Sequence, residues 1–330
     1  RDSVASRGLG DVYKRQDLYL FAFFAFLVAF AGSIQDIAID AFRIEVAELS
    51  EQGNLAASYQ FGYRMSILVA SSFALIFAAD YGWRLTYQLM AVFMMIGVIG
   101  ASICPEVLNK KLERLTFKSS FIEPLRDFVS RFGIYMSSLL LMIIATYRLT
   151  DIVMGPMASP FYLDSGYTLK EIGYIVKIVA VVASIIGFFL GGLLVKKVGV
   201  KTTLIIGAFL VMLTNLSFSS VAILEKDLTL LGFVVGIDSL AAGVVGTANI
   251  TFLTSLVSKK YTAVQYALLT SFMMLPGKVF SGFSGLIADY FKNLYGNDYG
   301  WMIFFVITSF LTLPCIILLL YYSRESFQRD

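Results

Sequence analysis

Two aspartates stand one helical turn apart in QDIAIDAFRIE, residues 35–45, after a long apolar run. Asp36 and Asp40 share one face of a helix, and Arg43 follows Asp40 three residues later. Two neighbouring carboxylates repel each other, which favours a proton on one of them. Arg64 begins the next, antiparallel helix at a similar depth, so an Asp–Arg lock across the hairpin is the alternative. The pattern predicts proton coupling or gating, and both remain open.

A second set of charges interrupts the apolar sequence further along, at Arg148, Asp151, Lys177 and Asp238. Arg148 and Asp151 share a helix face, and all four positions are expected near the middle of their helices. Two cations and two anions can neutralise one another, and an anionic substrate can then compete for the cations, because guanidinium and ammonium groups bind carboxylates. The set predicts a substrate-binding charge network, with a purely structural ion-pair cluster as the alternative.

Gly155, Pro156 and Pro160 follow Asp151 on the same apolar stretch. Proline removes a backbone donor and disturbs the preceding turn, so these residues predict a helix break. Unpaired backbone groups at such a break can face a cavity, as in many transporters.

The environment of these charges is strongly apolar. Of 330 residues, 58% are hydrophobic and only 15% are charged, with a mean hydropathy of +0.78 and a net charge of +3. A soluble domain has about 25% charged residues, so the composition indicates an integral membrane protein. The sequence has no histidine, which leaves proton transfer to carboxylates. Its two distant cysteines, Cys104 and Cys315, predict neither a disulfide framework nor a metal site, and we expect no cofactor.

Nine apolar stretches are long enough to cross a hydrocarbon core of about 30 Å as helices. The fold class that they predict is all-α and integral to the membrane. They cover residues 18–39, 59–79, 84–104, 133–163, 170–195, 202–223, 229–257, 262–289 and 301–322.

Lysine and arginine gather on alternate loops, with fourteen in one set and four in the other. The positive-inside rule assigns the richer set to the cytoplasm, together with the charged linker 105–132 and the tail 323–330. Residues 1–16 carry four basic residues on the opposite side and differ in composition from the rest. We therefore expect a non-native or disordered leader there.

The tetrapeptide DYGW occurs at 80–83 and again at 298–301, each time where a predicted outer loop opens a span. Six spans lie between the copies, which predicts two similar six-helix halves related by an axis along the membrane normal. Residues 17–104 are then the last three helices of the first half, and 133–322 are the complete second half. Three further helices are expected upstream, and we expect no transport by the printed chain without them.

Several segments resemble known transporters. GGLLVKKVGVKTTL (191–204) resembles the cytoplasmic loop of the major facilitator superfamily, with Val195 at its acidic position. QDIAIDAFRIE, followed by GYRM (62–65), resembles the AmpG muropeptide permease family, whose members show Q-D-x-x-x-D-A and then G-Y-R. Residues 147–177 and 241–272 extend this resemblance over most of the chain.

The resemblance implies nine of the twelve helices of a major facilitator bundle, and a monomeric permease of the bacterial inner membrane. It implies proton-coupled import of an anionic glycopeptide, GlcNAc-anhydroMurNAc peptides, for cell-wall recycling, and no enzyme activity. Acetyl-CoA transporters share the Q-D-x-x-x-D pattern, so acetyl-CoA or another anionic metabolite is the alternative substrate, although TAVQYALLTS (262–271) favours the AmpG side. A membrane-embedded acyltransferase is disfavoured by the lack of histidine, and no nucleic-acid motif occurs.

Overall fold

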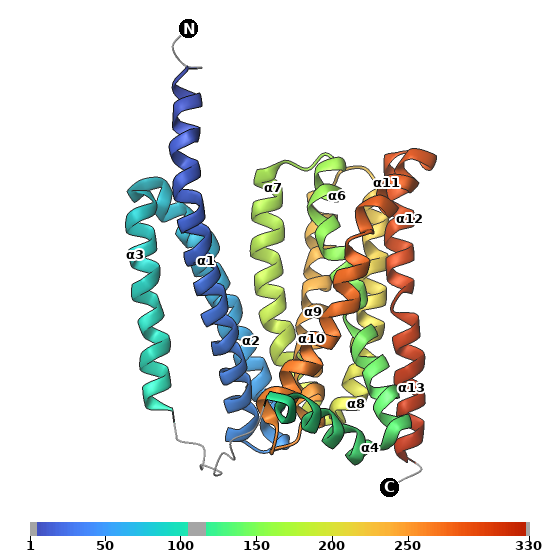
Figure 1. Cartoon of the computed structure of the whole chain (residues 1–330). Helices are drawn as coiled ribbons and strands as arrows, with labels where there is room; N and C mark the ends of the chain where they lie inside the picture. The colour runs from blue at the N-terminus through green and yellow to red at the C-terminus, as the bar shows by residue number, and fades with distance from the viewer. Residues whose placement is uncertain (1–4, 105–116, 328–330) are drawn as a thin grey trace.

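The computed structural model describes residues 5–104 and 117–327, and every regular element within these ranges is a helix (Figure 1). Most helices run along one common direction, with the N-terminus at one end of the bundle and the C-terminus at the other. The first three long elements are α1 (Ala5–Val46), α2 (Gln52–Leu68) and α3 (Ala74–Ile103), joined by the 3-10 turn η1 (Leu49–Glu51) and the π turn η2 (Val69–Phe73). The remaining elements are α4 (Phe117–Tyr147), α5 (Leu149–Met154), η3 (Gly155–Met157), α6 (Ala158–Asp164), α7 (Leu169–Tyr174), η4 (Ile175–Val179), α8 (Ala180–Ile223), α9 (Leu228–Leu256), α10 (Thr262–Ser281), α11 (Ser284–Tyr295), α12 (Asn297–Phe310) and α13 (Leu313–Phe327).

The predicted all-α membrane bundle is confirmed, although individual spans divide differently from the prediction. Among the described residues, six helical stretches are long and apolar enough to cross a membrane. One of them, Ala180–Ile223, joins the second part of the predicted span 170–195 to the predicted span 202–223 through a non-helical turn at Gly199. The predicted span 59–79 is divided by the π turn η2, and 262–289 by the break between α10 and α11.

Glycines with positive φ make the tight reversals between helices. Gly82, Gly133 and Gly199 have φ angles of 78°, 75° and 81°, which side chains with a Cβ atom rarely adopt. The Gly199 turn lies in the basic segment 191–204. These turns let successive helices pack directly against each other without a long loop.

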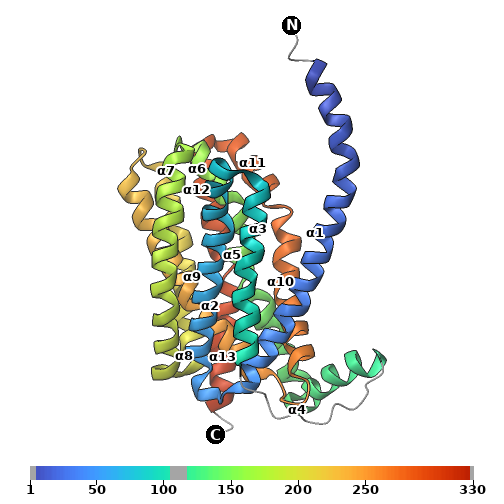
Figure 2. The ribbon, with the colours of Figure 1, turned by 90° about the vertical axis from the view of Figure 1, so that its left-hand side faces the viewer.

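The central linker is more ordered than the sequence indicates. Residues 117–132, which were expected to be a solvated linker, form the first part of α4 as far as the turn at Gly133. This helical segment lies across the lower end of the bundle, near the C-terminus (Figures 1 and 2). The segment is helical and most of its described side chains are exposed, whereas residues 105–116 lie outside the described ranges.

The beginning of the chain also differs from the expected leader. Helix α1 starts at Ala5 and continues without interruption into the first predicted span. Residues 5–16 therefore have helical backbone, and residues 1–4 lie outside the described ranges.

The two DYGW copies have different local structures. In the first copy Gly82 makes the turn, whereas in the second copy the turn residue is Gly296, with φ 82°, just before the motif. Trp301 is 1% exposed and donates a hydrogen bond from Nε1 to Asp164 Oδ2 at 3.1 Å, whereas Trp83 is 56% exposed. Both copies open a helix, but the tryptophan is buried only in the second copy.

Close packing of small residues brings α8 against α9. A methyl group on Gly243 would lie 2.5 Å from the carbonyl oxygen of Ser184 and 2.8 Å from the Cα atom of Gly187. Without a hydrophobic driving force in lipid, such close backbone approach is a main source of helix association. At the other end of the bundle, Phe161 packs edge-on against Trp301 and Phe305, with ring centroids 5.5 and 4.7 Å apart.

We predict that Gly243→Ala destabilises the bundle by about 1–3 kcal/mol, because the added methyl group overpacks the α8–α9 contact. The melting temperature of the purified protein in detergent should fall. Gly97→Ala on α3 is the matched control, because a methyl group there meets nothing within 4 Å. Equal melting temperatures for the two variants would contradict the packing role of Gly243.

Candidate functional site

A cavity of about 440 Å³ lies between the first three helices and the rest of the bundle. Its lining comes from α1 and α2 on one side and from α9 and α10 on the other, with Arg148 between α4 and α5. Small-molecule sites in proteins usually have volumes of about 300–1,000 Å³ and are mostly apolar with a few placed polar groups. The cavity is therefore the candidate functional site.

Charged residues from both sets identified in the sequence line the cavity. Asp36 and Asp40 from α1 line it, and so does Arg148 from the second half. Arg148 lies more than a hundred residues after Asp36 and Asp40 in the sequence. Helix α10 packs against α1 and also against α4 and α5, and this packing brings the three side chains to the same cavity. The arrangement offers both an acidic and a basic group to a bound molecule.

The other residues of the second predicted set do not form one charge network. Arg148 Nε lies 3.1 Å from Asp151 Oδ2, and both side chains are largely buried. Asp238 accepts a hydrogen bond from Thr214 Oγ1 at 3.0 Å, and among the described side chains it forms no ion pair. Lys177 belongs to the π turn η4, and its side chain lies outside the described part of the structure.

The helical stretch around Arg148 is interrupted at this residue and again at Gly155–Met157. Arg148 itself separates α4 from α5, with φ −102° and ψ 5°. Further on, the 3-10 turn η3 covers Gly155 and Pro156, and Pro160 lies in the first turn of α6. These breaks position a short helix of six residues beside the cavity and expose Gly155, Pro156 and Pro160.

A buried arginine lies next to the acidic pair. Arg43 is 5% exposed, and its Nη2 atom lies 3.6 Å from Asp40 Oδ1. Its Nη1 atom donates hydrogen bonds to Gln52 Oε1 and to Thr254 Oγ1, each 3.2 Å long. We call Arg43, Gln52 and Thr254 the arginine clasp, because it joins α1, α2 and α9.

Gln52 holds the clasp together from the other side. Its Nε2 atom contacts the carbonyl oxygens of Arg43 and Ala47 at 3.2 Å each, at the end of α1. The guanidinium of Arg43 lies 5.8 Å from the ring centre of Tyr59 and 5.4 Å from that of Tyr266, and both tyrosines line the cavity. The clasp thus lies directly behind the cavity wall, where cation–π contact favours the buried charge.

Arg64 does not make the lock that the sequence predicts. Its guanidinium lies 5.9 Å from the ring centre of Phe188, and no ion pair joins it to Asp36 or Asp40 among the described side chains. The lock across the hairpin runs through Arg43 and Gln52 instead, because Gln52 reaches back to the end of α1.

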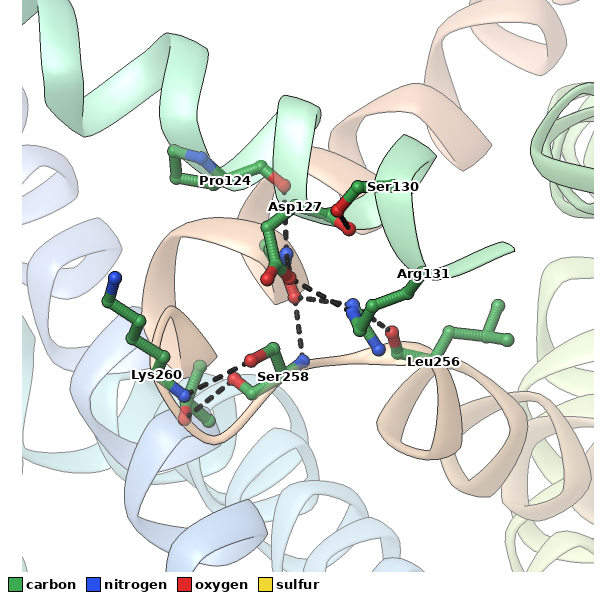
Figure 3. A network of polar contacts seen from close by, with 9 residues as sticks. Pro124, Asp127, Ser130, Arg131, Leu256, Ser258 and Lys260 are labelled. Carbon is green, nitrogen blue, oxygen red and sulfur yellow. Dashed lines mark hydrogen bonds and ion pairs between the residues drawn. The ribbon is translucent and has the colours of Figure 1, made fainter. Parts of the chain in front are cut away.

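A second polar network fixes the linker segment to the loop between α9 and α10 (Figure 3). Arg131 binds Asp127 Oδ2 through Nε and the carbonyl oxygen of Leu256 through Nη2, each at 2.9 Å. The buried side chain of Gln265 donates to Asp127 Oδ2 and to the carbonyl oxygen of Pro124, each at 2.8 Å. Gln265 therefore anchors the start of α10, the helix that carries Tyr266 into the cavity wall.

The two glutamines and Thr254 do not stand out in the sequence as functional residues. Gln52 stands in SEQGN, which has the composition of an exposed loop, but the structure buries it to 1% exposure. Thr254, Gln265 and Tyr266 lie within residues 241–272, which carry the family resemblance, and that was the one available signal for them.

Comparison with known proteins gives one family model, described as the Major Facilitator Superfamily, which matches residues 12–281. A transporter of Rickettsia conorii named AmpG 4 is 31% identical over 92% of this chain and 73% of its own length. A transporter of Rickettsia bellii named AmpG 1 is 29% identical over 92% of this chain and 74% of its own. The protein of Escherichia coli K12 named anhydromuropeptide permease is 29% identical over 96% of this chain and 63% of its own.

We predict that Thr254→Val loosens the arginine clasp, because it removes the acceptor that ties Arg43 to α9. Loss of one such hydrogen bond shifts the opening equilibrium by ~1 kcal/mol, or about fivefold. The measurement is the labelling rate of a cysteine placed at Ala267 in the cavity wall, in a Cys104→Ser background. A membrane-impermeant maleimide should react faster from the side on which the loop of residues 47–51 lies.

Thr251→Val is the matched control on the same helix, one turn earlier. Its hydroxyl bonds only to the carbonyl oxygen of Thr247 within α9, so its loss should leave the labelling rate unchanged. Equal rates for the two variants would show that the clasp does not close the cavity.

Proposed function

Because this chain belongs to the AmpG family of the major facilitator superfamily, we propose that it imports anhydromuropeptides across the bacterial inner membrane, driven by the proton gradient. The family and the apolar helices indicate that the protein is a multi-pass membrane transporter. The substrate, the coupling ion and the direction are proposals.

One observation carries the proposal: the cavity between the two halves, with Asp36 and Asp40 on one wall and Arg148 on the other. Ionisable side chains within membrane spans are costly and typically mark substrate or proton pathways. A site at the interface of two halves is also where alternating access by rocking of the halves exposes a ligand first to one side and then to the other.

The substrate class follows from the relatives and from the chemistry of the walls. One similar protein is named anhydromuropeptide permease, and a muropeptide carries carboxylates, amides and hydroxyl groups. A substrate carboxylate can compete with Asp151 for the guanidinium of Arg148, because such charge-assisted bonds are strong. Asp238, held by Thr214, and Lys177 are proposed to complete the charge balance deeper in the second half.

Proton coupling is assigned to the acidic pair, and the clasp links it to gating. A proton on Asp40 would remove its attraction to Arg43, whose Nη2 atom lies 3.6 Å away. Arg43 would then rely on Gln52 and Thr254 alone, so that the clasp would open more readily. The two roles considered for Asp36 and Asp40, proton carrier and gate, become two steps of one process.

The proposed orientation follows the positive-inside rule, which places the clasp, the linker segment and the C-terminus in the cytoplasm. In this orientation the halves contact each other at the cytoplasmic end, where α1 and α2 meet α8, α9 and α10. We further propose that the transporter acts as a monomer, because its cavity is formed within one chain. The break at Gly155, Pro156 and Pro160 would supply the local bending that rocking requires.

The proposal predicts protonophore-sensitive uptake of radiolabelled GlcNAc-anhydroMurNAc tripeptide by the protein expressed from its complete gene. The cells should lack their own muropeptide permease. Asp40→Asn should reduce this uptake at least about tenfold, since an intramembrane carboxylate that carries a proton cannot be replaced by an amide. Asp289→Asn, a substitution at an exposed site on α11 away from the cavity, should leave uptake intact.

Uptake that persists with a protonophore would contradict proton coupling but would still support the muropeptide as the substrate. No uptake by a well-expressed protein would refute the muropeptide, and labelled acetyl-CoA would then be tested as the anionic alternative.

A further inference from the structure

Two carboxamide side chains face the cavity from opposite halves. Asn249 from α9 and Gln60 from α2 both line it. Neither was singled out by the sequence, and neither belongs to the charged groups assigned to coupling. Together they give the walls a pair of donors and acceptors that charges alone do not provide.

Asn249 is a buried polar group with unused capacity. Its side chain is 3% exposed, and its Nδ2 atom contacts the sulfur of Met273, a weak acceptor, at 3.1 Å. Its Oδ1 atom accepts no hydrogen bond from the described part of the protein. A buried acceptor without a partner is costly, so such a group in a cavity wall points to a ligand that donates to it.

A glycine makes room for the second amide. Gly246 lies one turn before Asn249 on α9, and a methyl group there would lie 3.1 Å from the Nε2 atom of Gln60. The amide of Gln60 thus reaches across the boundary between the halves to the helix that carries Asn249. Gln60 lines the cavity and forms no hydrogen bond within the described residues, so its amide is free to bind a ligand there.

We propose that Asn249 and Gln60 form a subsite that recognises a secondary amide of the substrate. The substrate N–H donates to Asn249 Oδ1, and the substrate carbonyl accepts from Gln60 Nε2. Arg148, on the wall of the same cavity, binds a carboxylate of the same molecule. The ligand class is therefore an N-acylated compound with an acid group, and the inference rests on the proposed function for its choice of muropeptide.

The subsite also couples recognition to the closure of the cavity. Each amide comes from a different half, so one bound amide group bridges α2 and α9, which the arginine clasp also joins through Gln52 and Thr254. A substrate without the amide would bind Arg148 but would not bridge the halves. Selectivity is then set where the halves meet, beyond simple charge attraction.

The test compares KM for three probes in the uptake assay: GlcNAc-anhydroMurNAc tripeptide, the same compound with both sugars de-N-acetylated, and the disaccharide without peptide. The wild type should prefer the probe that retains the recognised amide. In Asn249→Ala the preference should fall about fivefold or more through KM, with kcat little changed, because one buried hydrogen bond is lost. If Asn249→Ala no longer prefers the complete compound over the de-N-acetylated probe, the recognised amide belongs to the sugars. If it no longer prefers the complete compound over the probe without peptide, the recognised amide belongs to the peptide.

Asn215→Ala is the matched control. Asn215 is equally buried and its Oδ1 atom also lacks a partner, but it lies on α8 outside the cavity lining. This variant should keep the wild-type preference. Gln60→Leu, at a half-buried site, gives a second variant should Asn249→Ala fail to fold, and it should lose the same preference.

The outcomes separate the two proposals. A transporting wild type whose preference is unchanged by Asn249→Ala and by Gln60→Leu would overturn the amide subsite alone. A wild type that neither transports the muropeptide nor gains thermal stability from it would refute the proposed function and the subsite together.

Discussion

The structure depends on how one buried cation is stabilised. Arg43 is buried at the end of α1, and a buried charge without partners would be very costly. Its stabilisation comes from Asp40, Gln52, Thr254 and the rings of two tyrosines, which belong to α1, α2, α9 and α10. Satisfying Arg43 therefore draws the two halves together at one end, and the cavity lies directly beside this junction.

The contacts on either side of the junction differ in kind. Helices α8 and α9 approach through Gly187 and Gly243, whose contact leaves no room for a side chain and makes a rigid unit. Between the halves, Gly53 of α2 packs closely against Gly192 and Val195 of α8, and the arginine clasp adds polar contacts beside this packing. In the proposed mechanism the second half moves as a unit against the first, and protonation of Asp40 would weaken the polar clasp at the junction.

Much of the fold could be predicted from composition and apolar spans, because lipid requires every backbone group to bond within helices. The Asp36–Asp40–Arg43 and Arg148–Asp151 pairs were also predictable, since their spacing fixes a common helix face. The partners of Arg43 were not, because Thr254 and Gln52 are distant or loop-like in sequence and are selected only by how the helices pack. The prediction that Arg64 pairs with the aspartates failed for the same reason. The depth of a residue in the membrane can be counted along its helix, but the rotation of the helix about its axis depends on packing. The contacts of the linker segment could not be predicted either, because the partners of Asp127 and Arg131, Gln265 and the end of α9, are distant in the sequence.

The central claim, that substrate binds between the halves, can be tested most directly by photo-crosslinking. An anhydromuropeptide carrying a diazirine on its peptide would be photolysed with the purified protein, and the modified positions would be mapped by mass spectrometry. The account predicts label within residues 33–40 of α1 and within 246–253 of α9 or 263–274 of α10, and its loss with excess unlabelled muropeptide. Competed label confined to the outward face of α3, with none in these segments, would contradict it.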